Sequence, residues 1–463
     1  MSTFGVDFIE AGWPGSNPKD AEFFRRAKKE LSADARSKLV AFGSTRRKGM
    51  DVALDLQIQA LVDSGAPSIC IVAKAHKWQV TDIIRATPEE NLQMIFDSVS
   101  HLKRLGKQVF VDMEHFFDGY KFDEHYSLEC CTAAVNAGVD GIVLCDTNGG
   151  SMPWKVEEIT RRIVQEFDDV TIGVHAHNDA GMAVANSLSA ARGGAGMIQG
   201  TINGIGERTG NADLCSIVPS LALHMDSHLL CNNHLPELTN VSRFVDETLN
   251  RKPDSSAPYV GASAFAHKGG LHVAAMERSP LSYQHVDPSL VGNEKRILIS
   301  ELSGRQNIMG KMKDAGAADV PDHILSERAT AILNRVKDLE SIGYTFEGAE
   351  ASVDIMILHT TVGYCPPFKV LDYSTQVFET ALRPEYKDLS RTSKDNKNPS
   401  LTARATIKVR TLNFDNDDTV SLPNNQYQLK CNFVIICGFQ IMFAIIMIIS
   451  LVFFFFSKSF LLN

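Results

Sequence analysis

Seven short apolar segments, each ending in polar residues, recur along the first half of the chain. They occupy residues 5–13, 37–44, 67–75, 108–116, 141–148, 171–178 and 197–207. Their starts lie 26 to 41 residues apart, which is the length of one strand plus one helix in a parallel β/α repeat. The spacing therefore predicts parallel strands that alternate with helices.

The stretches between these segments have the pattern of helices. The clearest begins at Thr87, which is followed by Pro88 at the first helical position and by the capping-box glutamate Glu90. Gly106 predicts its end. Between these limits the apolar residues recur at helical spacing, as Leu92, Ile95, Phe96, Val99 and Leu102.

Near-continuous apolar strands between helices indicate a parallel sheet covered by those helices. Polar residues suited to chemistry stand at the C-terminal ends of the segments, where a TIM barrel holds its active site: Glu10, Glu114, Thr147, His175 and His177. A doubly wound sheet would more often carry a glycine-rich phosphate loop after its first strand, and this sequence has none there. We therefore expect an α/β fold of the TIM (β/α)8 type, with one strand fewer than a closed barrel needs.

The hydrophobic pattern changes after about residue 225, and we expect four regions along the chain. A further helix is expected near residues 322–341, and the alternation at 401–411 predicts a strand. The regions are the barrel domain 1–225, helical linker subdomains 226–386, a linker with the start of a further domain 387–430, and an apolar tail 431–463.

The segment 431–457 contains no charged residue and is long enough to span a bilayer, which needs about 20 apolar residues. A single-pass membrane helix is one interpretation, and translated AT-rich non-coding sequence is the other. Its runs of Ile, Phe and Met favour the second. The N-terminus has no signal-peptide pattern, so we expect the cytoplasm or an organelle stroma.

The formal net charge of −9 argues against a nucleic-acid-binding protein. Nine cysteines without a CxxC pair indicate reduced thiols in a reducing compartment, most of them acting as small buried apolar residues. Because the net charge is negative, the binding of a small acidic substrate would need a local cation or a metal ion.

His175 and His177 stand two positions apart at the end of an apolar run. On a strand these residues face the same side, so both imidazoles could bind one metal ion, whereas on a helix they would diverge. The alternative is that both only hydrogen-bond within the core. Their place at the end of a predicted strand favours a metal site.

Seven motifs occur in order along the chain. They are EAGWPGSNPKD (10–20), MEHFFDGY (113–120), CDTNGG (145–150), HAHND (175–179), NGIGERTGN (203–211), AFAHKGGLH (264–272) and SELSGRQNI (300–308). In these motifs the chain resembles the citramalate synthase and 2-isopropylmalate synthase family of acetyl-CoA-dependent Claisen condensing enzymes, over roughly residues 4–410. HFFDGY and GWPGSNPKD look more like the citramalate synthase branch. The resemblance implies a TIM barrel, helical subdomains and a C-terminal regulatory domain, in a homodimer.

The sequence departs from the family pattern at both ends. Family members begin with a strand that carries an adjacent Arg-Asp pair, in which the aspartate binds the metal and the arginine stabilises the developing enolate. Met1 stands just before the second strand of that pattern, so we expect this first strand to be absent, which would account for the count of seven. The regulatory domain is expected to be truncated within residues 387–430.

The resemblance also implies a metal site. His175, His177 and Asn211 match the family's metal positions, and the ion would be Mg, Mn, Zn or Co. Such an ion would act as a Lewis acid on a bound 2-oxo acid. We expect Asp179 to orient one of the histidines.

Further positions match family residues around the substrate. Glu114 and Thr147 are expected to contact the oxo acid, Glu114 also as a catalytic residue, and Asp112 shares the inward face with Glu114 and is expected to shape the pocket. His272 and Tyr283 match the catalytic pair thought to assist proton transfer, acting on the partner subunit's barrel. Their alternative role is packing within the subdomain.

The resemblance therefore predicts an acyltransferase that condenses acetyl-CoA with pyruvate to citramalate on the route to isoleucine. A 2-isopropylmalate or homocitrate synthase is the alternative within the enzymes, since the oxo acids differ only in the group that the pocket must hold. An alternative of another class is an inactive barrel fragment or a membrane-tethered binding protein.

Overall fold

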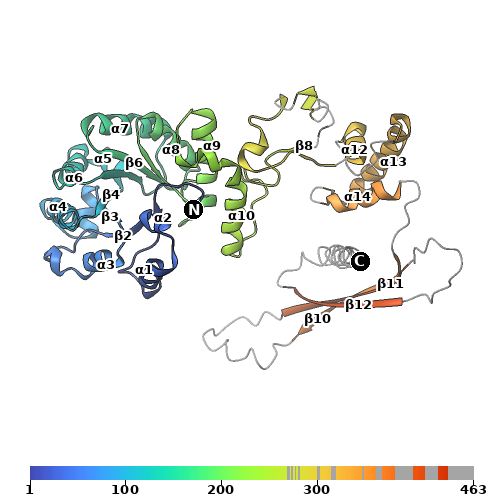
Figure 1. Ribbon diagram of the computed structural model, residues 1–463, viewed down its shortest axis with the longest axis horizontal. Coiled ribbons are helices and arrows are strands. Elements are labelled where there is room, and N and C mark those ends of the chain that lie inside the picture. The colour runs from blue at the N-terminus through green and yellow to red at the C-terminus, as the bar shows by residue number, and fades with distance from the viewer. Residues whose placement is uncertain are drawn as a thin grey trace. The chain divides into compact units, whose positions relative to one another are not determined.

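The structure, a computed structural model, describes residues 1–267, 282–299, 303–313, 320–346 and 349–360, single residues between 269 and 279, and three later strands (Figure 1). Its contacts divide the chain into two compact units, 1–348 and 349–463, which are described separately. This division is by contact alone. The expected functional regions that end at 225, 386 and 430 stay predictions.

A seven-stranded parallel sheet forms the centre of the first unit, with the strands in sequence order. The number and direction of strands in the described residues thus confirm the prediction. The strands are β1 Ile9–Glu10, β2 Leu39–Ser44, β3 Ser68–Lys74, β4 Gln108–Glu114, β5 Gly141–Asp146, β6 Thr171–Ala176 and β7 Met197–Gln199.

Helices follow the strands and lie along the outside of the sheet (Figure 1). The expected capping at Thr87 is present, because the Thr87 side chain accepts a hydrogen bond from the Glu90 N–H and Pro88 is the first helical residue. The helices are α1 Pro18–Glu30, α2 Ala33–Ser37, α3 Leu56–Ser64, α4 Pro88–Arg104, α5 Phe116–Phe122, α6 Glu124–Asn136, α7 Pro153–Glu166, α8 Ala183–Arg192 and α9 Leu214–His224.

The two faces of the sheet differ in what they bury. On β4, Val109, Val111 and Met113 point to the helices and are fully buried in the main hydrophobic core. Phe110 points to the other face, where it joins a smaller apolar cluster with Val40 and Cys70. The inner face therefore carries both an apolar floor and the polar side chains described below.

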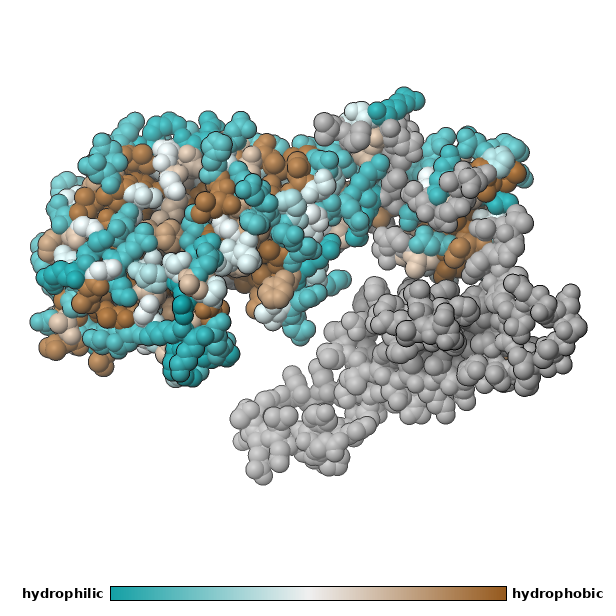
Figure 2. Space-filling model, in the orientation of Figure 1, coloured by the Kyte–Doolittle hydropathy of each residue, from teal (hydrophilic) through white to brown (hydrophobic). Residues whose placement is uncertain are grey.

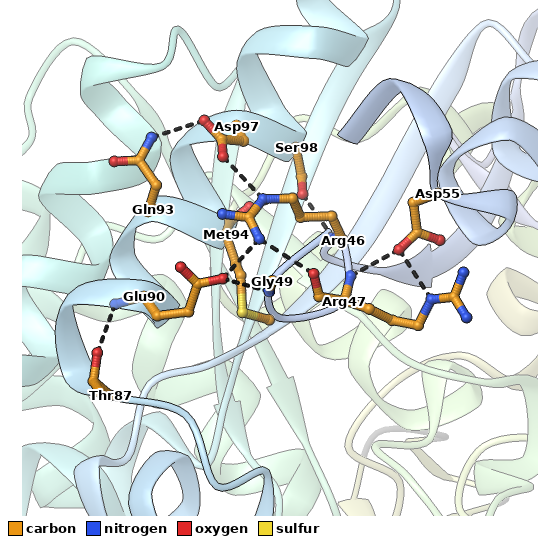
Figure 3. Close-up of polar contacts among 10 residues, drawn as sticks. All are labelled: Arg46, Arg47, Gly49, Asp55, Thr87, Glu90, Gln93, Met94, Asp97 and Ser98. Atoms are coloured by element: carbon orange, nitrogen blue, oxygen red, sulfur yellow. Dashed lines mark hydrogen bonds and ion pairs between the residues drawn. The ribbon is translucent and has the colours of Figure 1, made fainter. Parts of the chain in front are cut away.

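A buried arginine fixes the loop that follows β2 (Figure 3). The Arg46 side chain pairs with Glu90 at 2.8 Å and with Asp97 at 2.9 Å, both on α4. Its backbone N–H donates to the Ser98 hydroxyl at 2.8 Å. The loop after β2 is thereby tied to the helix after β3, at the carboxyl edge of the sheet.

Beyond α9 the first unit is mixed in structure, with the expected helix at 322–341 present as α13. A second core joins Phe4 and Ile202 to Leu238, Tyr259 and Val291. The elements are η4 Leu230–Glu237, α10 Leu238–Thr248, β8 Ala266–His267, η6 Pro288–Val291, β9 Arg296–Ile297, α12 Arg305–Met312 and α13 Asp322–Ser341.

The second unit contains α14 Glu350–His359 and an antiparallel sheet in the order β10-β11-β12. Its strands are β10 Phe368–Thr380, β11 Ser400–Thr411 and β12 Gln426–Ile435. The strand expected at 401–411 is confirmed as β11. Most of the expected linker, 387–399, and the tail from 436 onward lie outside the described residues. None of the helices that are described is long and apolar enough to cross a membrane.

Hydrophilic residues cover much of the visible face of the first unit, with apolar patches between them (Figure 2). Large apolar side chains that are exposed in the described residues lie on several separate elements, among them Leu56 on α3, Trp154 on α7 and Phe244 on α10. Scattered apolar side chains are ordinary on a protein surface.

Candidate active site

Strand β6 brings the two histidines together on the inner side of the sheet. His175 is in the strand and His177 directly follows it, with the imidazole centroids 5.1 Å apart. The fold thus supplies the strand geometry on which the expected metal site depends.

Asn211 reaches the same place through backbone pairing with the end of β6. It forms an isolated antiparallel bridge with His177, and the Ala212 N–H donates to the Ala176 carbonyl at 3.0 Å. Its side-chain nitrogen lies 3.3 Å from His175 Nε2. Three side chains from two segments therefore meet at the carboxyl edge of the sheet.

The chemistry of this cluster fits a divalent cation. Asn211 Oδ1 and His177 Nδ1 are buried and have no hydrogen-bond partner. Burial, and then the neighbouring His175, lowers the pKa of His177, which favours the neutral imidazole that binds metals. Nowhere in the described residues do three or more His, Cys, Asp or Glu side chains gather in a metal-binding group, so an ion held by the two histidines would need a donor of another type, such as the Asn211 amide oxygen.

A hydrogen-bonded chain extends from His175 across the inside of the sheet. His175 Nδ1 lies 2.7 Å from Gln199 Oε1 on β7. The Gln199 amide N–H donates to Asp112 Oδ1 on β4 at 3.0 Å, and the Cys70 thiol donates to the same oxygen at 3.1 Å. Because β4 and β7 are separated by two strands in the sheet order, these contacts require the sheet to be strongly curled.

Asp112 is buried, and this burial raises the pKa of its carboxyl, while His175 acts in the opposite direction. The expectation that Asp112 faces inward is met, but its described partners are Gln199 and Cys70. Sequence reasoning missed Gln199. Its signal is the cross-strand register, which pairs Gln199 with His175.

Glu10 is a second acidic group on this inner face. Solvent reaches its side chain on one side, while protein atoms surround it on the others. Burial, and then the charge of Asp112, raises the pKa of Glu10 to about 8. Two carboxyl groups with raised pKa values therefore lie near each other on the inner face, Asp112 buried and Glu10 open to solvent on one side.

Glu114 ends β4 and forms an ion pair with Lys74 of β3, at 2.5 Å. The strand register places these two residues side by side. Lys74 was not expected from the sequence. It brings a positive charge to the carboxyl end of the sheet.

Thr147 follows β5 and accepts a hydrogen bond from the His115 N–H at 2.7 Å. The Arg208 side chain donates to the Thr147 carbonyl at 2.7 Å and to both oxygens of Asp179 at 2.8 Å. Asp179 was expected to orient a histidine, but its described side-chain hydrogen bonds go to Arg208. The arginine thus joins the loops that follow β5, β6 and β7.

His272 and Tyr283 stack on each other, with ring centroids 4.2 Å apart and an angle of 22° between the rings. Both side chains are exposed. Among the described contacts, none joins this pair to His175 or His177. The structure therefore brings the expected pair together without placing it at the histidine cluster of the same chain.

Comparison with protein families matches residues 1–245 to the HMGL-like family and residues 259–343 to the homocitrate synthase post-HMGL domain-like family. The chain is 46% identical to the (R)-citramalate synthase of Aquifex aeolicus over 77% of this chain and 67% of that protein. It is 44% identical to the (R)-citramalate synthase of Streptomyces coelicolor, over 83% of this chain and 71% of that protein.

A 2-isopropylmalate synthase of Sulfolobus acidocaldarius is 32% identical over 76% of this chain and 86% of that protein. The HMGL-like match covers the whole parallel sheet, including both histidines and Asn211. The chain therefore belongs to the HMGL-like family.

Proposed function

We propose that the protein condenses acetyl-CoA with pyruvate to give citramalate and CoA. The observation that carries the proposal is the meeting of His175, His177 and Asn211 at the carboxyl edge of an HMGL-like sheet. The higher identity to (R)-citramalate synthases than to the 2-isopropylmalate synthase supports pyruvate as the oxo acid.

The proposed reaction has two bond-forming stages. A base removes a proton from the acetyl methyl group, and the resulting carbanion attacks the keto carbon of pyruvate, whose oxygen then takes up a proton. Water next attacks the thioester carbonyl and CoA leaves as the thiol. The net products are citramalate and CoA.

His175, His177 and Asn211 would hold the divalent ion. Bound there, such an ion would supply Lewis acidity toward the keto oxygen of the 2-oxo acid. The neutral state of His177 that burial favours suits this role.

The chain's own polar groups would orient the substrate. The Thr147 hydroxyl accepts from the His115 N–H, so its own hydrogen can be donated to a substrate oxygen. Lys74, held beside Glu114, would attract the pyruvate carboxylate, and Glu114 would remain beside the reacting atoms as an acceptor.

Proton transfer is assigned in this proposal to His272 and Tyr283. Their exposed, stacked rings could serve the barrel of a second subunit, which would make the active unit a homodimer. Reduced, buried thiols suit a reducing compartment, and we place the reaction in the cytoplasm or an organelle stroma.

The test is citramalate formation by the purified chain with acetyl-CoA and a divalent metal, followed by chromatography of the products. We expect formation to depend on pyruvate and to be lost in His175→Ala and His177→Ala. Preferential use of 2-oxoisovalerate would instead identify a 2-isopropylmalate synthase. A folded, metal-loaded chain that makes no product from any of these oxo acids would refute the proposal.

A further inference from the structure

The hydrogen-bonded chain behind His175 fixes the direction of each of its bonds. Asp112 Oδ1 accepts from the Cys70 thiol and lies 3.0 Å from the Gln199 amide nitrogen. An oxygen that accepts from a thiol can also accept from an amide N–H, whether or not the other carboxyl oxygen carries a proton. In the structure the Gln199 nitrogen faces Asp112, and because an amide nitrogen can only donate, Oδ1 accepts this bond as well.

This orientation leaves the Gln199 amide oxygen facing His175. Oε1 lies 2.7 Å from His175 Nδ1, and an amide oxygen can only accept. His175 Nδ1 must then carry the hydrogen, and Nε2 must carry the lone pair.

A separate contact agrees with this assignment. His175 Nε2 lies 3.3 Å from the Asn211 amide nitrogen, which is a donor and requires an acceptor opposite it. The bare nitrogen of His175 thus faces the same residue whose Oδ1 is buried without a partner. Both contacts of the ring point to the Nδ1–H tautomer.

We propose that Gln199 is a positioning residue that holds His175 in the Nδ1–H tautomer, with Nε2 directed to the candidate metal site, and that Asp112 orients Gln199. The relevance of this inference to catalysis rests on the proposed function. The hydrogen-bond partner of a metal-bound histidine commonly sets which ring nitrogen binds the metal, and losing it typically weakens metal affinity by roughly 10- to 100-fold.

The experiment uses the full chain labelled with 15N-histidine and metal-free, at a pH where the imidazole is neutral. Two-bond 1H–15N spectra distinguish the two tautomers, and the His175 signal is assigned by its loss in His175→Gln. We expect the Nδ1–H tautomer in the unsubstituted chain. An Nε2–H tautomer there would overturn the inference without any variant.

Gln199→Met keeps the length of the side chain but removes the acceptor. We expect it to lose the tautomer preference and to bind Mn²⁺ or Co²⁺ at least tenfold more weakly by titration calorimetry, in line with the loss of a partner behind a metal ligand. Gln165→Met, an exposed change on α7, is the matched control and should alter neither reading.

A double variant that restores the hydrogen bond to His175 tests whether Gln199 positions the imidazole or only packs against it. Gln199→Glu combined with Asp112→Asn restores an acceptor toward His175 and a donor toward residue 199, so it should recover tighter metal binding than Gln199→Met. A folded Gln199→Met that keeps both tautomer and affinity would refute the inference. If the unsubstituted chain binds no metal, the proposed function loses its metal site, while the tautomer spectra still decide the role of Gln199.

Discussion

At the scale of single residues, the candidate metal site depends on the absence of a side chain at Gly206. A Cβ on Gly206 would stand 2.3 Å from Asn211 Oδ1, far inside van der Waals contact. The Asn211 side chain would have to turn away. Gly206 therefore leaves the space in which the amide oxygen sits beside the histidines.

We expect Gly206→Ala to weaken divalent-metal binding by roughly tenfold, because the amide oxygen is displaced while both histidines remain. Titration calorimetry with Mn²⁺ measures the change. Gly310→Ala is the control, since a Cβ at Gly310 on α12 meets nothing within 4 Å. Equal affinities in Gly206→Ala and the unsubstituted chain would remove Asn211 from the ligand set.

Glu10 makes stability depend on pH. Its carboxyl has an ordinary pKa of 4.5 in the unfolded chain, and burial followed by Asp112 raises the pKa to about 8 in the folded protein. Below pH 4.5 both states hold the proton; between these values the folded state binds more protons, so the free energy of unfolding decreases as pH rises.

We expect Glu10→Gln to reduce this loss of stability, measured as the shift of the urea midpoint between about pH 5 and about pH 8. The effect should be modest because solvent reaches the carboxyl. Glu158→Gln, an exposed change on α7, should leave the pH dependence as it is. An identical pH profile for Glu10→Gln would show that Glu10 is not the responsible group.

At the scale of elements, the loop after β2 is attached to α4 by the charges around Arg46 (Figure 3). The arginine is buried, whereas Glu90 and Asp97 are each about 30% exposed. The hydrogen bond from Arg46 also lowers the pKa of Glu90. Replacing Arg46 with an apolar residue would leave the carboxylates of Glu90 and Asp97 facing a buried apolar side chain.

We expect Arg46→Met to destabilise the protein by about 3 kcal/mol, near the low end for breaking a buried ion pair because the partners are partly solvated. Urea unfolding followed by circular dichroism measures it. Arg26→Met removes an exposed pair with Glu30 and should not change the midpoint detectably. A loss no larger than that of Arg26→Met would mean that packing, not charge, holds the loop.

The elements were largely predictable from the sequence because their causes are local. Apolar runs at strand spacing gave the seven strands, and Thr87 and Pro88 marked the start of α4. The partners of the site residues were not predictable in this way. Lys74 beside Glu114 and Gln199 behind His175 follow from strand register and from curling of the sheet, which no local pattern records.

At the scale of the whole molecule, the proposed chemistry is divided between two places in one chain. The histidine pair lies in the sheet, and the stacked His272 and Tyr283 lie in the segment after it. If the His272–Tyr283 pair of each subunit acts on the histidine pair of the other subunit, a single chain does not contain a complete active site. Loss of one half in one subunit should then be compensated by its partner.

We expect His175→Ala and His272→Ala to be inactive separately and to regain pyruvate-dependent citramalate formation after subunit exchange, because the mixed dimer retains one intact site. Native mass spectrometry verifies that mixed dimers form. Mixed dimers without activity would place His272 on its own subunit's barrel, whereas a His272→Ala chain that is active by itself would place His272 outside the reaction.

The buried thiols give the molecule built-in reporters of opening. Cys70 lies on the inner face of the sheet and Cys131 lies on α6 in the main core on the other face, and burial raises the pKa of both well above the usual value. Neither can react with a disulfide reagent until its face is uncovered and the thiolate forms. The ratio of their labelling rates, measured by peptide mass spectrometry, would distinguish local exposure of the inner face from unfolding of the whole protein. A metal ion that joins the end of β6 to Asn211 should slow the labelling of Cys70 more than that of Cys131.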